Sequence, residues 1–95
     1  MIISIEEEKE INQMWEFEAY LLSDDHNRKT ITLLLPFYAY SKWCPDASLR
    51  PSEIALAVLK LIIALKPNLL KKNPLYLTII EHYEENIFNL IPNYL

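Results

Sequence analysis

The chain of 95 residues contains no glycine, and this absence limits what it can fold into more than any other feature of its sequence. Proteins rich in strands rely on glycine for tight turns and bulges, because glycine adopts positive φ without steric cost. Helices need no glycine, and proline and asparagine can end them. The missing glycine therefore favours an all-α fold. It also excludes P-loops and dinucleotide-binding fingerprints, which both require glycine.

The apolar content predicts a single packed domain. Apolar residues make up 52% of the chain and aromatic residues 12%, which is too apolar for a disordered protein. A chain of this length forms one domain, so we expect residues 1–95 to fold as a single helical unit. The longest apolar run, residues 54–65, is interrupted by Lys60 and is shorter than the ~20 residues of a membrane span.

Net charge and cysteine content indicate the compartment and the class of partner. The net charge of −4 argues against nucleic acid as a partner, because phosphate binding favours a basic surface. Cys44 is the only cysteine, so no internal disulfide can form. A signal peptide begins with a basic region, whereas the residues near the N-terminus of this chain are acidic. We therefore expect a reduced intracellular protein, nuclear or cytoplasmic.

Two helices are predicted before residue 44. Ser4 and Glu7 match a capping box, and the apolar residues that follow recur at helical spacing, which predicts a helix over residues 4–22. Good N-cap residues at 23–25 precede a second predicted helix over residues 26–43. Pro36 lies inside that segment and predicts a kink near residues 32–36, or two shorter helices.

A third helix is predicted to form the centre of the fold. Pro51 suits the first position of a helix over residues 51–66, and this segment is apolar nearly all round. Residues 67–73 are predicted to be a loop, and Pro74 opens a fourth helix that either continues to Pro92 or divides at residues 84–86. The side chains predicted to be almost fully buried in the third helix are Ile54, Ala55, Val58, Leu59, Ile62 and Leu65.

Residues 49–59 read Leu-Arg-Pro-Ser-Glu-Ile-Ala-Leu-Ala-Val-Leu, and this stretch resembles the second cyclin box. In that family a hydrophobic residue and the pattern x-Pro-Ser-x-Ile-Ala precede an alanine-rich apolar helix. Residues 30–43 correspond to the second helix of the box, and residues 77–95 to its fourth and fifth helices. The resemblance is to the transcription-kinase type, the relatives of cyclin H, and implies a five-helix cyclin-like bundle with a buried central third helix.

The resemblance implies a regulatory subunit, or its C-terminal half, that binds and activates a cyclin-dependent protein kinase in the cell cycle or in transcription. It would act by stabilising one kinase conformation. The first cyclin box is not recognisable, so an isolated second box would expose apolar surface and could self-associate. Two alternatives stay open: a helical adaptor or scaffold unrelated to kinases, and a nucleic-acid module, because cyclin-like repeats also occur in a general transcription initiation factor.

No catalytic, cofactor or metal site is expected, so the protein is predicted not to be an enzyme. His26 lies beside Asp24 and Asp25, but metal binding requires three or four convergent ligands and no further partner follows at helical spacing. Cys44 with a histidine could form a nucleophile pair. Its position beside a tryptophan and a proline is more typical of packing.

The remaining candidates also favour a binding protein without catalysis. His82 with Glu81 and Glu84 could shuttle protons, but this pattern is typical of a helix surface. The acidic run at residues 6–10 is either a solvated first turn or a dock for a basic partner. The aromatic residues are predicted to serve the core or a protein interface. Only residues 38–43 approach the interleaving with basic residues that base stacking requires.

Overall fold

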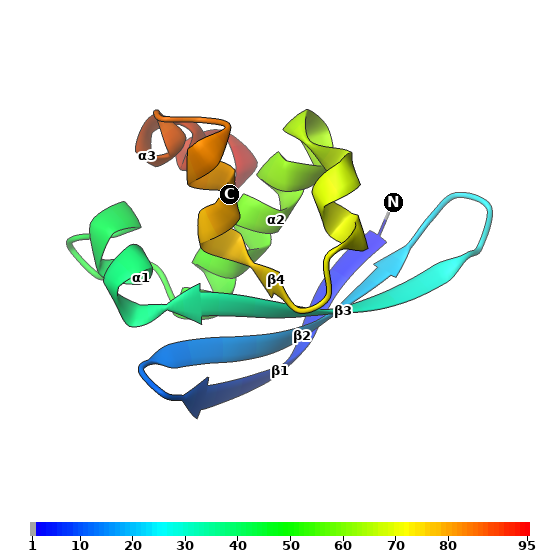
Figure 1. Cartoon of the computed structure of the whole chain (residues 1–95), viewed down its shortest axis with the longest axis horizontal. Helices are drawn as coiled ribbons and strands as arrows, with labels where there is room; N and C mark the ends of the chain where they lie inside the picture. Colours follow the sequence, from blue (N-terminus) through cyan, green and yellow to red (C-terminus); the bar gives the residue numbers. More distant parts are fainter. Residues whose placement is uncertain (1) are drawn as a thin grey trace.

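The computed structural model describes residues 2–95, and its main element is a four-stranded sheet with helices on one face (Figure 1). The strands are β1 (Ile2–Ile11), β2 (Met14–Leu22), β3 (Arg28–Pro36) and β4 (Leu75–Tyr76), in that order across the sheet. β1, β2 and β3 are antiparallel neighbours, and β4 pairs with β3 in parallel. The predicted all-α fold, a five-helix cyclin-like bundle, is therefore wrong. The kinase-regulatory function implied by the resemblance of residues 49–59 therefore loses the support of the five-helix layout.

Only one of the predicted helices is present over its expected length. The predicted helix over residues 51–66 is confirmed as α2 (Pro51–Leu65), with Pro51 in its first turn. The segment after it is broken into short pieces, so the loop over residues 67–73 and an unbroken helix from Pro74 are wrong, whereas the alternative, a break at residues 84–86, is present. The remaining helices are α1 (Phe37–Trp43), the 3-10 helices η1 (Pro67–Lys71) and η2 (Leu77–His82), α3 (Ile87–Leu90), and the 3-10 helix η3 (Ile91–Tyr94).

The predicted first helix, residues 4–22, is instead the β1–β2 hairpin. In β2 the side chains at 15, 17, 19 and 21 share the helix-covered face, and those at 16, 18 and 20 lie on the open face. This alternation is the period of a half-buried strand. The predicted capping box does not form, because residues 4–7 lie in β1 and not at the start of a helix; Ser4 Oγ instead donates a hydrogen bond to Glu6 Oε1 at 2.8 Å.

The turns show why the missing glycine does not exclude strands. Asn12 and Gln13 connect β1 to β2 with φ values of 49° and 64°, which are both positive, as in a type I′ hairpin turn. His26 adopts a φ of 65° in the β2–β3 turn, and Ala47 adopts 52° in the α1–α2 connection. Ordinary residues therefore occupy the positive-φ positions that glycine usually fills.

The predicted second helix, residues 26–43, divides at Pro36 into β3 and α1. Pro36 has φ −61° and ψ 146°, an extended conformation, so the chain changes from strand to helix there and does not kink within a helix. Trp15 holds α1 against β2, because the centroid of its ring lies 4.3 Å from the ring centroid of Phe37 and 5.1 Å from that of Tyr40.

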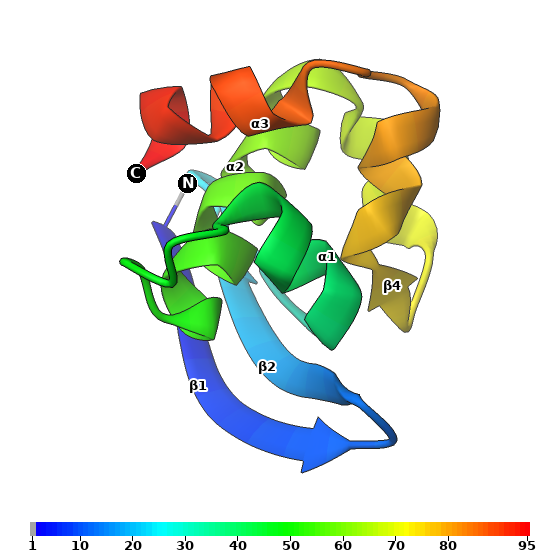
Figure 2. The same cartoon turned by 90° about the vertical axis from the view of Figure 1, so that its left-hand side faces the viewer.

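The core lies between the sheet and α2, which crosses the helix-covered face (Figure 2). Ile54, Ala55, Val58, Leu59 and Ile62 are completely buried, as predicted. The prediction for the sixth side chain is wrong: Leu65 is 45% exposed because it ends α2 beyond the cover of its neighbours. None of the helices in residues 2–95 has both the length and the apolar character needed to cross a membrane.

Candidate functional site

Two of the candidates, His26 and Cys44, lie far apart. His26 is exposed in the β2–β3 turn, and Cys44 is buried after α1 at the other end of the molecule (Figure 1). Asp25 organises that turn, since its carboxylate accepts hydrogen bonds from the Ser23 hydroxyl and from the Asn27 backbone N–H at 3.2 Å. The bond from Ser23 and the bond from the Asn27 backbone lower the pKa of Asp25. The Asp25 carboxylate therefore stabilises the β2–β3 turn.

The acidic residues around His82 also have a structural role. Glu81 Oε2 accepts a hydrogen bond from Lys42 Nζ at 2.6 Å, an ion pair that joins η2 to α1. His82 is the exposed last residue of η2, and Glu84 Oε1 accepts a hydrogen bond from the Asn86 backbone N–H at 3.2 Å. Within residues 2–95, no three His, Cys, Asp or Glu side chains are grouped so that they could hold a metal ion.

The two edges of the sheet differ. On the β3 side, β4 covers part of the edge, and Asn73 Oδ1 accepts the backbone N–H of Thr32 at 3.0 Å. Lys29 Nζ also donates to the Leu70 carbonyl at 2.7 Å, which ties η1 to this edge. On the other side β1 is the outermost strand, and no strand among residues 2–95 pairs with its outer edge (Figure 2). The free edge of the sheet is therefore β1.

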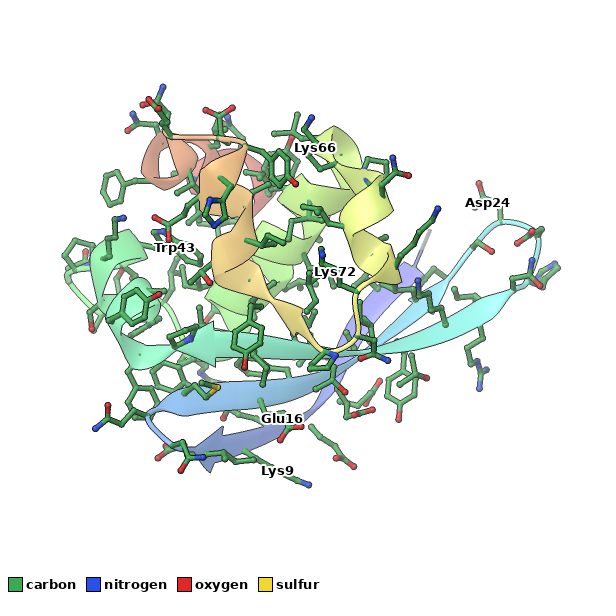
Figure 3. The ribbon with its side chains drawn as sticks, viewed as in Figure 1. Lys9, Glu16, Asp24, Trp43, Lys66 and Lys72 are labelled. Carbon is green, nitrogen blue, oxygen red and sulfur yellow. The ribbon has the colours of Figure 1, made fainter. Side chains whose placement is uncertain are left out.

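The free edge is strongly acidic. Residues 2–22 carry six glutamates against Lys9, whereas residues 23–95 carry seven acidic and eight basic side chains. The net negative charge of the protein therefore belongs to the β1–β2 hairpin. On the open face Glu7 lies opposite Glu18, and Lys9 lies opposite Glu16 (Figure 3).

A β-bulge places carboxylates on both faces of β1. The register shifts between Ile5 and Glu7, so Glu8 and Glu10 have the same orientation as the helix-facing Ile3 and Ile5. Both glutamates are nevertheless exposed. The acidic run was predicted to be either a solvated first helical turn or a dock for a basic partner, and the helical turn is wrong because the run lies in β1. The alternation of residues 14–22 was the signal that could have identified the hairpin and its edge.

A second candidate is a groove of about 640 Å³ between the α1–α2 connection and the C-terminal helices. The prolines of this region shape it, because Pro45 follows the end of α1 and Pro51 begins α2. Most of its lining is apolar. The residues that line it are Trp43, Cys44, Pro45, Asp46, Ser48, Leu49, Ile54, Phe88, Asn89, Ile91, Pro92 and Leu95.

The connection at one end of the groove is held by polar contacts. Asp46 Oδ1 accepts the Ser48 backbone N–H at 3.2 Å and lies 3.5 Å from the Cys44 thiol. The hydrogen bonds from the Ser48 hydroxyl and backbone, followed by that from Cys44, lower the pKa of Asp46, so its carboxylate is ionised at neutral pH. The Tyr40 hydroxyl donates to the Leu49 carbonyl, and burial, followed by the nearby Cys44, raises the pKa of Tyr40.

Trp43 lines the base of this groove and is 3% exposed. Its Nε1 is buried and has no hydrogen-bond partner among the residues that the structure describes. Figure 3 shows the side chain on the helix-covered side of the sheet, away from Lys9 and Glu16. The groove and the free edge of β1 are therefore separate surfaces.

Comparisons of the chain with protein-family models, with curated proteins and with solved structures find no match.

Proposed function

We propose that the protein is a non-catalytic binding module that adds a basic, extended segment of a partner protein as a fifth strand beside β1. The observation that supports this most directly is the position of β1, a strand of ten residues whose outer edge has no strand beside it in residues 2–95. An edge strand presents a row of backbone N–H and C=O groups that can pair with another chain. Main-chain hydrogen bonds supply affinity in this mode of recognition, and side chains supply specificity.

The charge of the hairpin selects a basic partner. Glu7, Glu8 and Glu10 are exposed on β1, and they project from both faces of the strand. A strand paired with β1 would place its side chains directly opposite them, where opposite charges stabilise the pair by about 0.2–1 kcal/mol each. Lysine or arginine at alternate positions of the partner would therefore be favoured on either face.

The same charges disfavour a second copy of β1 as the partner. An antiparallel pair centred on Glu7 or Glu8 would place carboxylates opposite carboxylates, which destabilises the pairing. An offset register would instead place the acidic half of one strand opposite the isoleucines of the other, where no charge is compensated. The proposal includes an intracellular location, nuclear or cytoplasmic, which the single buried Cys44 favours.

The test uses an alternating lysine–valine heptapeptide and three matched measurements. Titration into isotopically labelled protein should shift the backbone amide resonances of residues 2–11 and should leave those of α2 unchanged. A glutamate–valine peptide of the same length should not bind. A lysine–valine peptide with alternate backbone nitrogens methylated keeps its charge but cannot complete the strand, so it should bind much more weakly.

Two variants separate the edge from general electrostatic attraction. Glu8→Gln should raise the Kd by up to about fivefold, since one cross-strand charge pair contributes at most about 1 kcal/mol. Glu85→Gln removes the same charge from the exposed turn between η2 and α3, and should leave the Kd unchanged. Equal binding of the methylated and unmethylated peptides would show that charge alone attracts them, and the proposal would then be wrong.

A further inference from the structure

The groove between the α1–α2 connection and the C-terminal helices has the size and lining of a binding site. Its volume of about 640 Å³ lies within the range of roughly 300–1,000 Å³ that is typical of ligand sites. Such sites combine an apolar lining with a few polar groups at defined positions. Here the apolar lining comes from residues more than thirty positions apart in the chain. The polar groups come from the α1–α2 connection and from Asn89 in α3.

The groove leaves large apolar side chains in contact with water. Phe88 is 53% exposed and Leu95 is 58% exposed, and both line the groove. Trp43 and Ile54, which lie deeper, are buried. A partner that covers Phe88 and Leu95 would remove this apolar surface from water, which favours association.

One charge determines the polarity of the groove. Asp46 is the only lining residue with a charged side chain, and it is exposed. Its Oδ1 accepts a hydrogen bond from the Ser48 backbone N–H, which holds the carboxylate in place beside a mostly apolar lining. No basic side chain is among the lining residues, so nothing in the lining compensates this charge.

We infer that the groove binds a short peptide segment of a partner protein in which apolar side chains flank one lysine or arginine. The apolar side chains would contact Phe88 and Leu95, and the cation would pair with Asp46. The negative charge of Asp46 is the reason for a lysine or arginine in the bound peptide. The open apolar lining is the reason for apolar residues on either side of that cation. This site is separate from the edge of β1, and it needs no pairing of main chains.

The test uses a blocked tripeptide, leucyl-lysyl-phenylalanine amide, titrated to millimolar concentration. The indole N–H resonance of Trp43 is the reporter, because this side chain lines the groove and its Nε1 has no hydrogen-bond partner in residues 2–95. We expect this resonance and the amide resonances of Cys44 and Asp46 to shift together. Replacing lysine by norleucine in the peptide should raise the Kd by up to about fivefold, and replacing it by glutamate should raise it further.

Protein variants assign the binding to the groove. Asp46→Asn retains the Oδ1 acceptor for Ser48, so the connection keeps its fold, and it should abolish the preference for lysine over norleucine. Phe88→Ala should weaken binding of every peptide. Tyr38→Ala removes a similarly exposed aromatic ring from α1 outside the groove, and it should leave the Kd unchanged.

Three results would overturn the inference. The first is the absence of any shift of the Trp43 indole resonance with the lysine peptide at several millimolar. The second is equal affinity for the lysine and glutamate peptides. The third is binding of 4-phenylbutylamine without binding of the peptide, which would assign the groove to a small cationic molecule. Loss of β1 edge binding would leave all of these measurements unaffected, so the two proposals fail independently.

Discussion

Replacing Ala55 by arginine should destabilise the protein severely, because this position has no room for a larger side chain. Ala55 is completely buried on α2, between the sheet and the other helices. Overpacking a core position costs about 1–3 kcal/mol, and an unpaired buried charge adds several kcal/mol more. The expected loss is therefore about 4–6 kcal/mol, a large part of the ~5–15 kcal/mol that stabilises a typical domain.

Ala64→Arg is the matched control for this prediction. Ala64 is exposed on the same helix, so the same substitution should change the free energy of unfolding by less than about 0.5 kcal/mol. The assay is urea unfolding followed by tryptophan fluorescence and by circular dichroism, with the midpoints of the two variants compared. If Ala55→Arg does not fold, Ala55→Leu measures the overpacking alone, at about 1–3 kcal/mol. Equal midpoints for substitutions at the two positions would refute the packing of α2 described above.

Three further predictions concern the turns and the contacts between elements. Gln13→Gly should stabilise the hairpin by about 0.5–1 kcal/mol, because φ is 64° at this position. Asn12→Gly should stabilise it by less, because asparagine tolerates positive φ. Equal melting temperatures for Gln13→Gly and wild type would contradict this. Burial raises the pKa of Tyr40 above its unfolded value of 10.0, so the fold favours the protonated hydroxyl. The stability that depends on this group is fully present below pH 10.0 and is lost as the pH rises through the higher folded pKa. Tyr40→Phe should therefore flatten the loss of stability above pH 10.0, and urea midpoints of the two proteins that fall in parallel above pH 10.0 would show otherwise. The Lys42–Glu81 ion pair involves a lysine side chain that is 63% exposed, so a double-mutant cycle should give a coupling below about 1 kcal/mol; a value above about 2 kcal/mol would indicate a stronger role.

The elements that the sequence predicted correctly have strong local signals. α2 begins with Pro51, a residue that suits the first helical position, and apolar side chains occupy nearly all faces of the helix. Pro36 marked a break in the segment over residues 26–43, although the break separates a strand from a helix. A completely buried Ala55 also followed from the sequence, because a helix without a polar face must lie inside a fold.

The local signals for the β1–β2 hairpin conflicted, because only residues 14–22 show the alternation of a strand. Residues 6–10 contain glutamate and lysine, which are good helix formers, and residues 11–22 contain apolar positions compatible with both periods. Pairing with a third strand and packing under α2 decided the outcome, since an isolated two-stranded hairpin is marginally stable at best.

One apolar core, the burial of α2 within it and the concentration of negative charge before residue 23 can all be read from the residues in order. The chain had to fold before this charge lay on the hairpin that forms the free edge of a sheet, and before Trp43 and Asp46 shared a groove with Phe88. The difference lies in the range of the contacts. Caps, prolines and apolar runs act over a few residues, whereas strand pairing and helix docking join segments tens of residues apart, and no local pattern records which segments will meet.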